Sequence, residues 1–213
     1  MEKVIEEYKD CDLCPLSDFR GREGYNNIVF YRGSTNADVC IIGEAPGENE
    51  AIAGKAFVGR AGGVLDKILL EMNDERFIPE NTHLTNICMC RPPNNRAPYK
   101  KEILACMQRL TMQVSAVNPK ILIAMGNVAL KALTGKTGIT RMRGLLGKAE
   151  NVLCPSFKTR WVIANGEEPK GFMVGATFHP ASVFRGSDQE KNNKLAGIKT
   201  DMMLFKRILN RMT

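Results

Sequence analysis

The chain alternates short apolar runs with longer amphipathic stretches. Five short runs have the length and composition of buried strands: residues 37–42, 82–87, 120–124, 160–164 and 172–178. Five longer stretches place apolar side chains at helical spacing: residues 2–8, 61–72, 99–117, 126–134 and 189–211. Strands that alternate with helices in this way favour an α/β layer with a mostly parallel sheet.

Residues 41–63 (IIGEAPGENEAIAGKAFVGRAGG) join the first strand to a helix through a glycine-rich loop. A strand, a glycine-rich loop and a helix in this order present a ligand site at the carboxyl edge of a sheet. The loop also carries Glu44, Glu48 and Glu50, and so many acids are unsuited to a phosphate cradle. The segment therefore predicts chemistry on a ligand other than a nucleoside triphosphate.

Polar side chains also follow two other predicted strands. The carboxyl ends of parallel strands meet at one edge of a sheet, which would bring Glu44, Asn86 and His179 together. An asparagine can read an amide-like edge, and a histidine can donate to a carbonyl oxygen that gains charge. A histidine at a strand end is also consistent with a structural role. Phe57, in the glycine-rich loop, is consistent with core packing or with a stacking face for a ligand.

The seven cysteines include one CxxC pair, Cys11 and Cys14, and two widely spaced residues, Cys90 and Cys106. Four thiolates are enough for a tetrahedral zinc site or a [4Fe-4S] cluster, and their number does not separate the two. Four unrelated free cysteines are the alternative. Cys88 competes for a ligand role, because it lies two residues from Cys90.

Length and composition favour one domain over residues 1–213, since the chain has 44% apolar residues and room for one core. Residues 1–36 are too polar to form a core of their own, so we expect a metal site to tie them down. The net charge of +7 suits a polyanionic partner. No long apolar span or secretion signal is evident, which predicts a soluble, cytoplasmic protein.

Several motifs, taken together and in order, make almost the whole chain resemble the family 4 uracil-DNA glycosylases. These are the iron–sulfur members of the uracil-DNA glycosylase superfamily, and they include related domains of some phage DNA polymerases. The motifs are CDLC at 11–14, GEAPGENE at 43–50, AFVGRAG at 56–62, TNICMCRPPNNRAP at 85–98, ILIAMGNVAL at 121–130 and HPASVFR at 179–185.

The resemblance implies a three-layer α/β/α sandwich with a central four-stranded parallel sheet. It also implies a [4Fe-4S] cluster held by Cys11, Cys14, Cys90 and Cys106, which leaves Cys88 outside the pattern.

Residue roles follow from the same resemblance. Glu44 and His179 are the catalytic candidates, with Glu44 holding the attacking water and His179 facing O2 of the base. Phe57 would stack under the extruded base and Asn86 would read its edge. The remaining candidate substrate-binding residues in these motifs are Glu50, Ser182 and Arg185. The chain departs from the family pattern at Ala51, where members usually carry an acid, and at Ala56, where proline is common.

These residues lead to one main hypothesis and two alternatives. The main hypothesis is a monofunctional, monomeric enzyme of base excision repair that removes uracil from single- or double-stranded DNA. None of the motifs offers an evident lysine nucleophile, which favours base removal without strand cleavage. The second hypothesis is a catalytically weak module that binds DNA or a replication or repair protein. The third is a zinc-stabilised hydrolase of small nucleotides.

Overall fold

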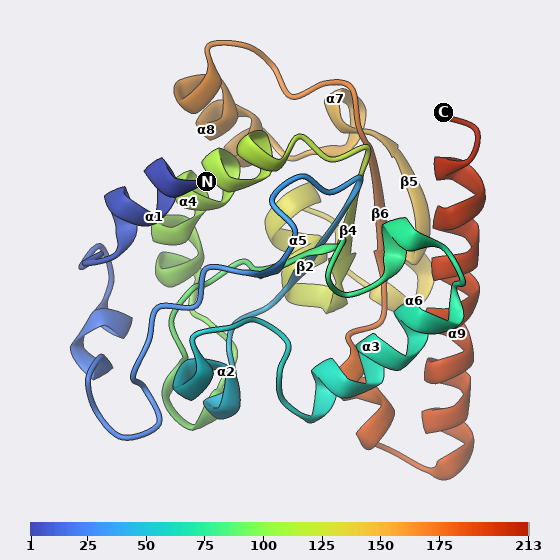
Figure 1. Ribbon diagram of the computed structural model, residues 1–213, viewed down its shortest axis with the longest axis horizontal. Coiled ribbons are helices and arrows are strands. Elements are labelled where there is room, and N and C mark those ends of the chain that lie inside the picture. Colours follow the sequence, from blue (N-terminus) through green and yellow to red (C-terminus); the bar gives the residue numbers. More distant parts are fainter. Residues whose placement is uncertain (213) are drawn as a thin grey trace.

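The computed structural model describes residues 1–212, which form three layers, a central sheet with helices on both faces (Figure 1). The strand order is β1-β3-β2-β4-β6-β5. The strands are β1 (Arg32–Gly33), β2 (Val39–Gly43), β3 (His83–Asn86), β4 (Ile121–Met125), β5 (Gly144–Lys148) and β6 (Met173–Thr177). The four central strands are parallel, whereas β1 and β5 are antiparallel edges. The predicted four-stranded parallel sheet is confirmed as the centre of a wider sheet.

Successive residues of the central strands face opposite helical layers, because side chains alternate along a strand. In β2, Cys40 and Ile42 belong to one apolar cluster and Val39 and Ile41 to the other. The first cluster packs against α4 (Lys100–Val117), α5 (Gly126–Thr134), α7 (Ala149–Val152) and α8 (Pro155–Asn165). The second packs against α3 (Arg60–Glu71) and α9 (Asp188–Leu209). The central strands are thus buried on both faces, as their continuous apolar runs require.

The N-terminal segment is attached through a third, small apolar cluster. Val4 and Tyr8 of α1 (Glu2–Tyr8) pack with Met89, which follows β3. The remaining short helices are α2 (Glu48–Ala53), α6 (Ile139–Met142) and the 3-10 turns Pro15–Phe19, Glu75–Phe77, Pro93–Asn95 and Pro180–Phe184. The five predicted helices are confirmed within one or two residues at each end. No helix within residues 1–212 is both long and apolar enough to cross a membrane.

The predicted strand at residues 160–164 is wrong, since these residues lie in α8. Pro155 occupies the first turn, and Gly166 ends the helix in the left-handed conformation with φ of 78°. Phe157 and Trp161, four positions apart, are both buried on the inner side of the helix. Strands β1 and β5 are not predicted by the hydrophobic pattern. Each is a short glycine-containing edge strand, and β5 has an irregular register between Leu145 and Gly147.

Helix α9 packs closely against β6 at a single glycine. A Cβ added to Gly175 would lie 2.7 Å from Cζ of Phe205, which is fully buried. Asp201, one helical turn earlier, accepts hydrogen bonds from Thr177 Oγ1 at 2.7 Å and from Arg143 Nε at 2.9 Å. Contact at Gly175 and polar pairing at Asp201 together fix the position of α9 on the sheet.

We predict that Gly175→Ala lowers the free energy of unfolding by about 1–3 kcal/mol, because the new methyl group overpacks the Phe205 ring. Gly63→Ala is the matched control, since a Cβ added to this helical glycine would have no atom within 4 Å and its φ is ordinary for a helix. Gly63→Ala should stabilise by roughly 0.5–1 kcal/mol. Urea denaturation measures both variants, and equal effects would contradict the close contact.

Candidate active site

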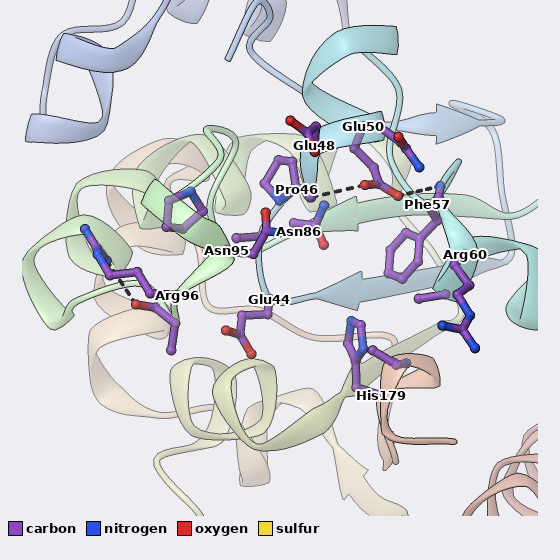
Figure 2. A pocket seen from close by; sticks show the side chains of 18 of the residues that line it. Glu44, Pro46, Glu48, Glu50, Phe57, Arg60, Asn86, Asn95, Arg96 and His179 are labelled. Atoms are coloured by element: carbon purple, nitrogen blue, oxygen red, sulfur yellow. Dashed lines mark hydrogen bonds between the residues drawn. The ribbon is translucent and has the colours of Figure 1, made fainter. Parts of the chain in front are cut away.

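A cavity of about 650 Å³ opens at the carboxyl edge of the parallel strands (Figure 2). Its wall comes from the loops after β2, β3 and β6 and from the loop that precedes α3. All seven residues predicted as catalytic or substrate-binding lie on this wall: Glu44, Glu50, Phe57, Asn86, His179, Ser182 and Arg185. The parallel sheet therefore brings the predicted strand ends together. The role of each residue stays a prediction.

The pairing of β2 with β3 places Glu44 beside Asn86. Gly43 is opposite Asn86 in the register, and the pairing continues beyond both strands. The Ile87 N–H donates to Gly43 O at 3.0 Å, and the Cys88 N–H donates to Glu44 O at 3.1 Å. The Glu44 carboxyl is half-buried, and this burial raises its pKa, whereas the charge of Arg185 opposes the rise.

Gly43 leaves room for the two side chains that cover the end of β2. A Cβ at this position would lie 2.7 Å from Phe57 Cζ and would also collide with Asn86 Oδ1. Asn86 is 3% exposed, and its side-chain amide has no hydrogen-bond partner within residues 1–212. The residue lines the cavity, where a ligand or water can pair with its amide. Asn86 therefore has a free donor and a free acceptor for a ligand.

The loop that carries Phe57 is fixed through its backbone. Glu50 accepts hydrogen bonds from the Gly47 N–H at 3.1 Å and from the Gly59 N–H at 2.7 Å, so one carboxylate joins both ends of the loop. Phe57 itself has φ of 55°, an unfavourable conformation for a bulky residue. Backbone strain of this kind persists where the surroundings determine it and is common at ligand sites. The Phe57 ring faces His179 with a centroid distance of 6.1 Å and an interplanar angle of 27°.

A hydrogen bond within its own turn fixes the tautomer of the His179 ring. Its Nδ1 accepts a hydrogen bond from the Ala181 N–H at 3.1 Å, so the ring proton resides on Nε2. Burial lowers the pKa of His179 to about 4, with a smaller contribution from the charge of Arg185. The imidazole is therefore neutral near pH 7 and offers one N–H donor, while Figure 2 shows the ring directed toward the cavity.

Ser182 and Arg185 belong to the turn that follows His179. The Ser182 Oγ is buried and has no partner within the described chain, so its hydrogen-bonding capacity is unused. Arg185 is exposed at the rim. Ala51, where the family pattern has an acid, is fully buried in α2 and does not line the cavity.

Three arginines near the cavity were not identified individually from the sequence. Arg60 lies over the Phe184 ring at 3.9 Å, and Arg96 forms a two-point ion pair with Glu102. Arg91 is 8% exposed and donates to Gly24 O, Glu48 and Asn95. Arg91 is therefore not a free cation for a phosphate contact. Its charge is used to join the loop to α2 and to the N-terminal segment.

The four predicted cysteine ligands gather between the N-terminal segment, α4 and the loop after β3. Burial and the neighbouring thiols of Cys106, Cys14 and Cys11 raise the pKa of Cys90 to about 12. Cys88 is fully buried in the same apolar cluster as Cys106. No group of three or more His, Cys, Asp or Glu side chains within residues 1–212 is arranged to hold a single metal ion.

Arg109 lies fully buried beside these cysteines, one helical turn after Cys106. No acidic side chain in the described chain forms an ion pair with it, and its Nε has no hydrogen-bond partner there. A buried guanidinium is costly without an anion. Thiolates that carry the negative charge of an iron–sulfur cluster would provide that anion. The residues therefore fit such a cluster.

The chain is similar to known proteins over most of its length. The family model of the uracil DNA glycosylase superfamily matches residues 30–202. The type-4 uracil-DNA glycosylase of Thermotoga maritima is 36% identical over 172 residues, which cover 78% of this chain and 84% of that protein. The corresponding protein of Saccharolobus solfataricus is 36% identical over 182 residues, or 85% of this chain and 76% of that protein.

A DNA polymerase of Bacillus phage SP01 is similar over a shorter part, with 34% identity over 119 residues, 56% of this chain and 13% of the polymerase. The family match spans the strands, the cavity wall and two of the four predicted cysteine ligands, Cys90 and Cys106. On these grounds the chain belongs to the uracil DNA glycosylase superfamily.

Proposed function

We propose that the chain removes uracil from DNA by hydrolysing the N-glycosidic bond, and that it leaves an abasic site in an uncut strand. One observation carries this proposal. An unpaired amide at Asn86, a neutral N–H donor at His179 and a half-buried carboxylate at Glu44 surround one cavity. Relatives named as type-4 uracil-DNA glycosylases support the same reaction.

The cavity suits a base that has left the duplex. The glycosidic bond is inaccessible within the base stack, so the nucleotide must first be extruded. The Phe57 ring gives the extruded base a stacking surface. The Asn86 amide can accept from N3–H of uracil and donate to O4. Cytosine presents the reverse pattern at these positions, so an amide in one fixed orientation discriminates between the two bases.

Neutral His179 stabilises the leaving base. As the glycosidic bond breaks, the sugar gains oxocarbenium character and the base gains negative charge that reaches O2. A positioned Nε2–H donor strengthens its bond as that charge develops, so it lowers the barrier and not merely the ground state. By analogy with an oxyanion-hole donor, this contact contributes on the order of 3 kcal/mol.

Glu44 acts on the attacking water and on the sugar. Its carboxylate can hold the attacking water, accept a proton from it and stabilise the positive charge on the sugar. Burial raises the pKa of Glu44, which makes the carboxylate a stronger base, and the charge of Arg185 opposes this rise. His179 thus stabilises the negative charge on the leaving base, and Glu44 stabilises the positive charge on the sugar.

Cys11, Cys14, Cys90 and Cys106 would hold a [4Fe-4S] cluster. One zinc ion needs its ligands at about 2.3 Å from a single point, whereas the four thiolates of such a cluster bind four separate irons and lie farther apart. The iron content and the visible absorption of the purified protein separate the two metals. When bound, the cluster supplies a cross-link between residues 1–36, α4 and the loop after β3.

DNA is the proposed partner, bound by a single copy of the chain. Most lysines of α9 already have local partners, such as Lys199 with Glu71 and Lys206 with Met72 O. Arg60 and Arg185 at the cavity rim are exposed and are the better candidates for phosphate contacts. The match to part of a phage DNA polymerase favours one alternative, a module that binds DNA or a replication protein without efficient catalysis.

A uracil-containing oligonucleotide, single- or double-stranded, should yield alkali-labile abasic sites on incubation with the protein, while the same sequence with thymine should not. His179→Ala should lower kcat about 10²–10³-fold, because it removes the donor to the leaving base. KM should change little, since the contact forms mainly in the transition state. Tight binding of the DNA without base release, unaffected by His179→Ala, would instead identify a binding module.

Cys90→Ala should abolish the brown visible absorption of the purified protein and lower its iron content. It should also make residues 1–36 sensitive to proteolysis, because binding at such a site is linked to folding. Cys88→Ala is the matched control two residues away, and it should retain the absorption and the iron. The ligand assignment is wrong if Cys88→Ala loses the cluster and Cys90→Ala keeps it.

A further inference from the structure

Arg109 connects the cysteine site to the base-reading end of β3. Its Nη2 donates to the carbonyl oxygens of both Asn86 and Ile87, each at 3.0 Å. Its Nη1 donates to Gln113 Oε1 and, at 3.4 Å, to Thr85 Oγ1. An arginine that served only to fill the core would not need to hold two successive carbonyls at the end of a strand.

These bonds fix the peptide that carries Asn86 from both sides. Arg109 holds the carbonyls of residues 86 and 87, while the N–H groups of Ile87 and Cys88 are held by Gly43 O and Glu44 O. A rotation of this peptide would therefore move the Asn86 amide and the backbone of Glu44 together.

The guanidinium is itself held in place by a buried polar network. Gln113, which accepts from Arg109, directs its Nε2 to His83 Nε2 at 2.9 Å and to Phe30 O at 3.0 Å. His83 Nδ1 in turn donates to Ser34 O at 2.7 Å. Gln113 and His83 each have a defined donor and acceptor role in this hydrogen-bond network, so the network fixes the orientation of the Arg109 guanidinium.

The remaining side of the guanidinium faces the cysteines. Cys106 lies three positions earlier on α4, on the same helix face, and Cys88 directly follows the held peptide. Burial lowers the pKa of Arg109, and the neighbouring Cys106 and Cys88 thiols counteract this effect. A loaded, anionic cysteine site would hold the buried cation, and the cation would hold the peptide of Asn86.

We propose that Arg109 is a positioning residue that makes the orientation of Asn86, and hence the selection of the base, depend on the cysteine site. This inference rests on the proposed function. It assigns to the cysteine site a second effect beyond attachment of the N-terminal segment.

The variant Arg109→Lys keeps the positive charge of the side chain but removes the branched guanidinium group. The ammonium group keeps the charge at the cysteine site but cannot donate to both carbonyls and Gln113 at once. Visible absorption and iron per chain should stay at the wild-type level. KM for uracil-containing DNA should rise about tenfold with kcat nearly unchanged, because Asn86 contacts the base before and during bond breaking. The ratio of uracil excision to cytosine excision should fall.

Arg143→Lys is the matched control. Like Arg109, Arg143 donates to a side chain and to a backbone carbonyl, here Asp201 and Gly197 O, but it lies under α9 and away from the cavity. This variant should lose stability without a change in KM or base preference. If Arg109→Lys behaves in the same way, Arg109 is only structural and the proposal is overturned.

Hydrogen exchange of the wild-type protein decides the question if Arg109→Lys does not fold. Removal of the cluster should speed exchange of the Ile87 and Cys88 amides at least tenfold, with β4 and β6 unaffected. Faster exchange confined to residues 9–16 and 89–91 would overturn the proposal. Neither exchange nor iron content requires catalysis, so a failure of uracil excision in the wild-type protein is distinguished from a failure of the coupling.

Discussion

The parallel pairing of β2 with β3 is the constraint on which the site depends. It sets Gly43 opposite Asn86 and continues for two further residues through the amides of Ile87 and Cys88. A slip by one residue would turn Asn86 to the other face of the sheet. Because Gly43 has no side chain, the Phe57 ring and the Asn86 amide can pack over the end of β2. The residues proposed for base recognition and water activation, Asn86 and Glu44, thus share one stretch of paired backbone.

Side chains that bind backbone groups hold the surrounding loops. Glu50 joins the two ends of the Phe57 loop, Glu102 accepts from the Tyr99 N–H beneath the proline-rich loop, and Arg109 holds the end of β3. Hydrogen bonds of this kind hold a site in place by fixing the residues that support it. They also explain why charged residues of the motifs bind the protein's own backbone, as Glu50 does through both carboxylate oxygens.

Much of this arrangement could be predicted from the sequence. Continuous apolar runs identified the central strands, and the rule that parallel strands end at one edge joined Glu44, Asn86 and His179. Predictions from local sequence patterns are wrong where contacts between distant parts of the chain determine the secondary structure. The β-branched run in α8 resembles a strand, and the edge strand β5 has no alternation to detect. Arg109 occupies a position in an amphipathic helix that suggests solvent exposure, and only the three-dimensional packing shows that it is buried.

The cavity presents His179 as a neutral imidazole with its proton on Nε2, and nitrogen NMR of the ring tests this state directly. The chain has only His83 and His179, so two sets of signals are expected. Both rings have a pKa of about 4 and should stay neutral from about pH 5 to 8. They should be opposite tautomers, with Nδ1 protonated in His83 and Nε2 in His179. A His179 ring that becomes protonated near pH 6.5, or that carries its proton on Nδ1, would contradict the account.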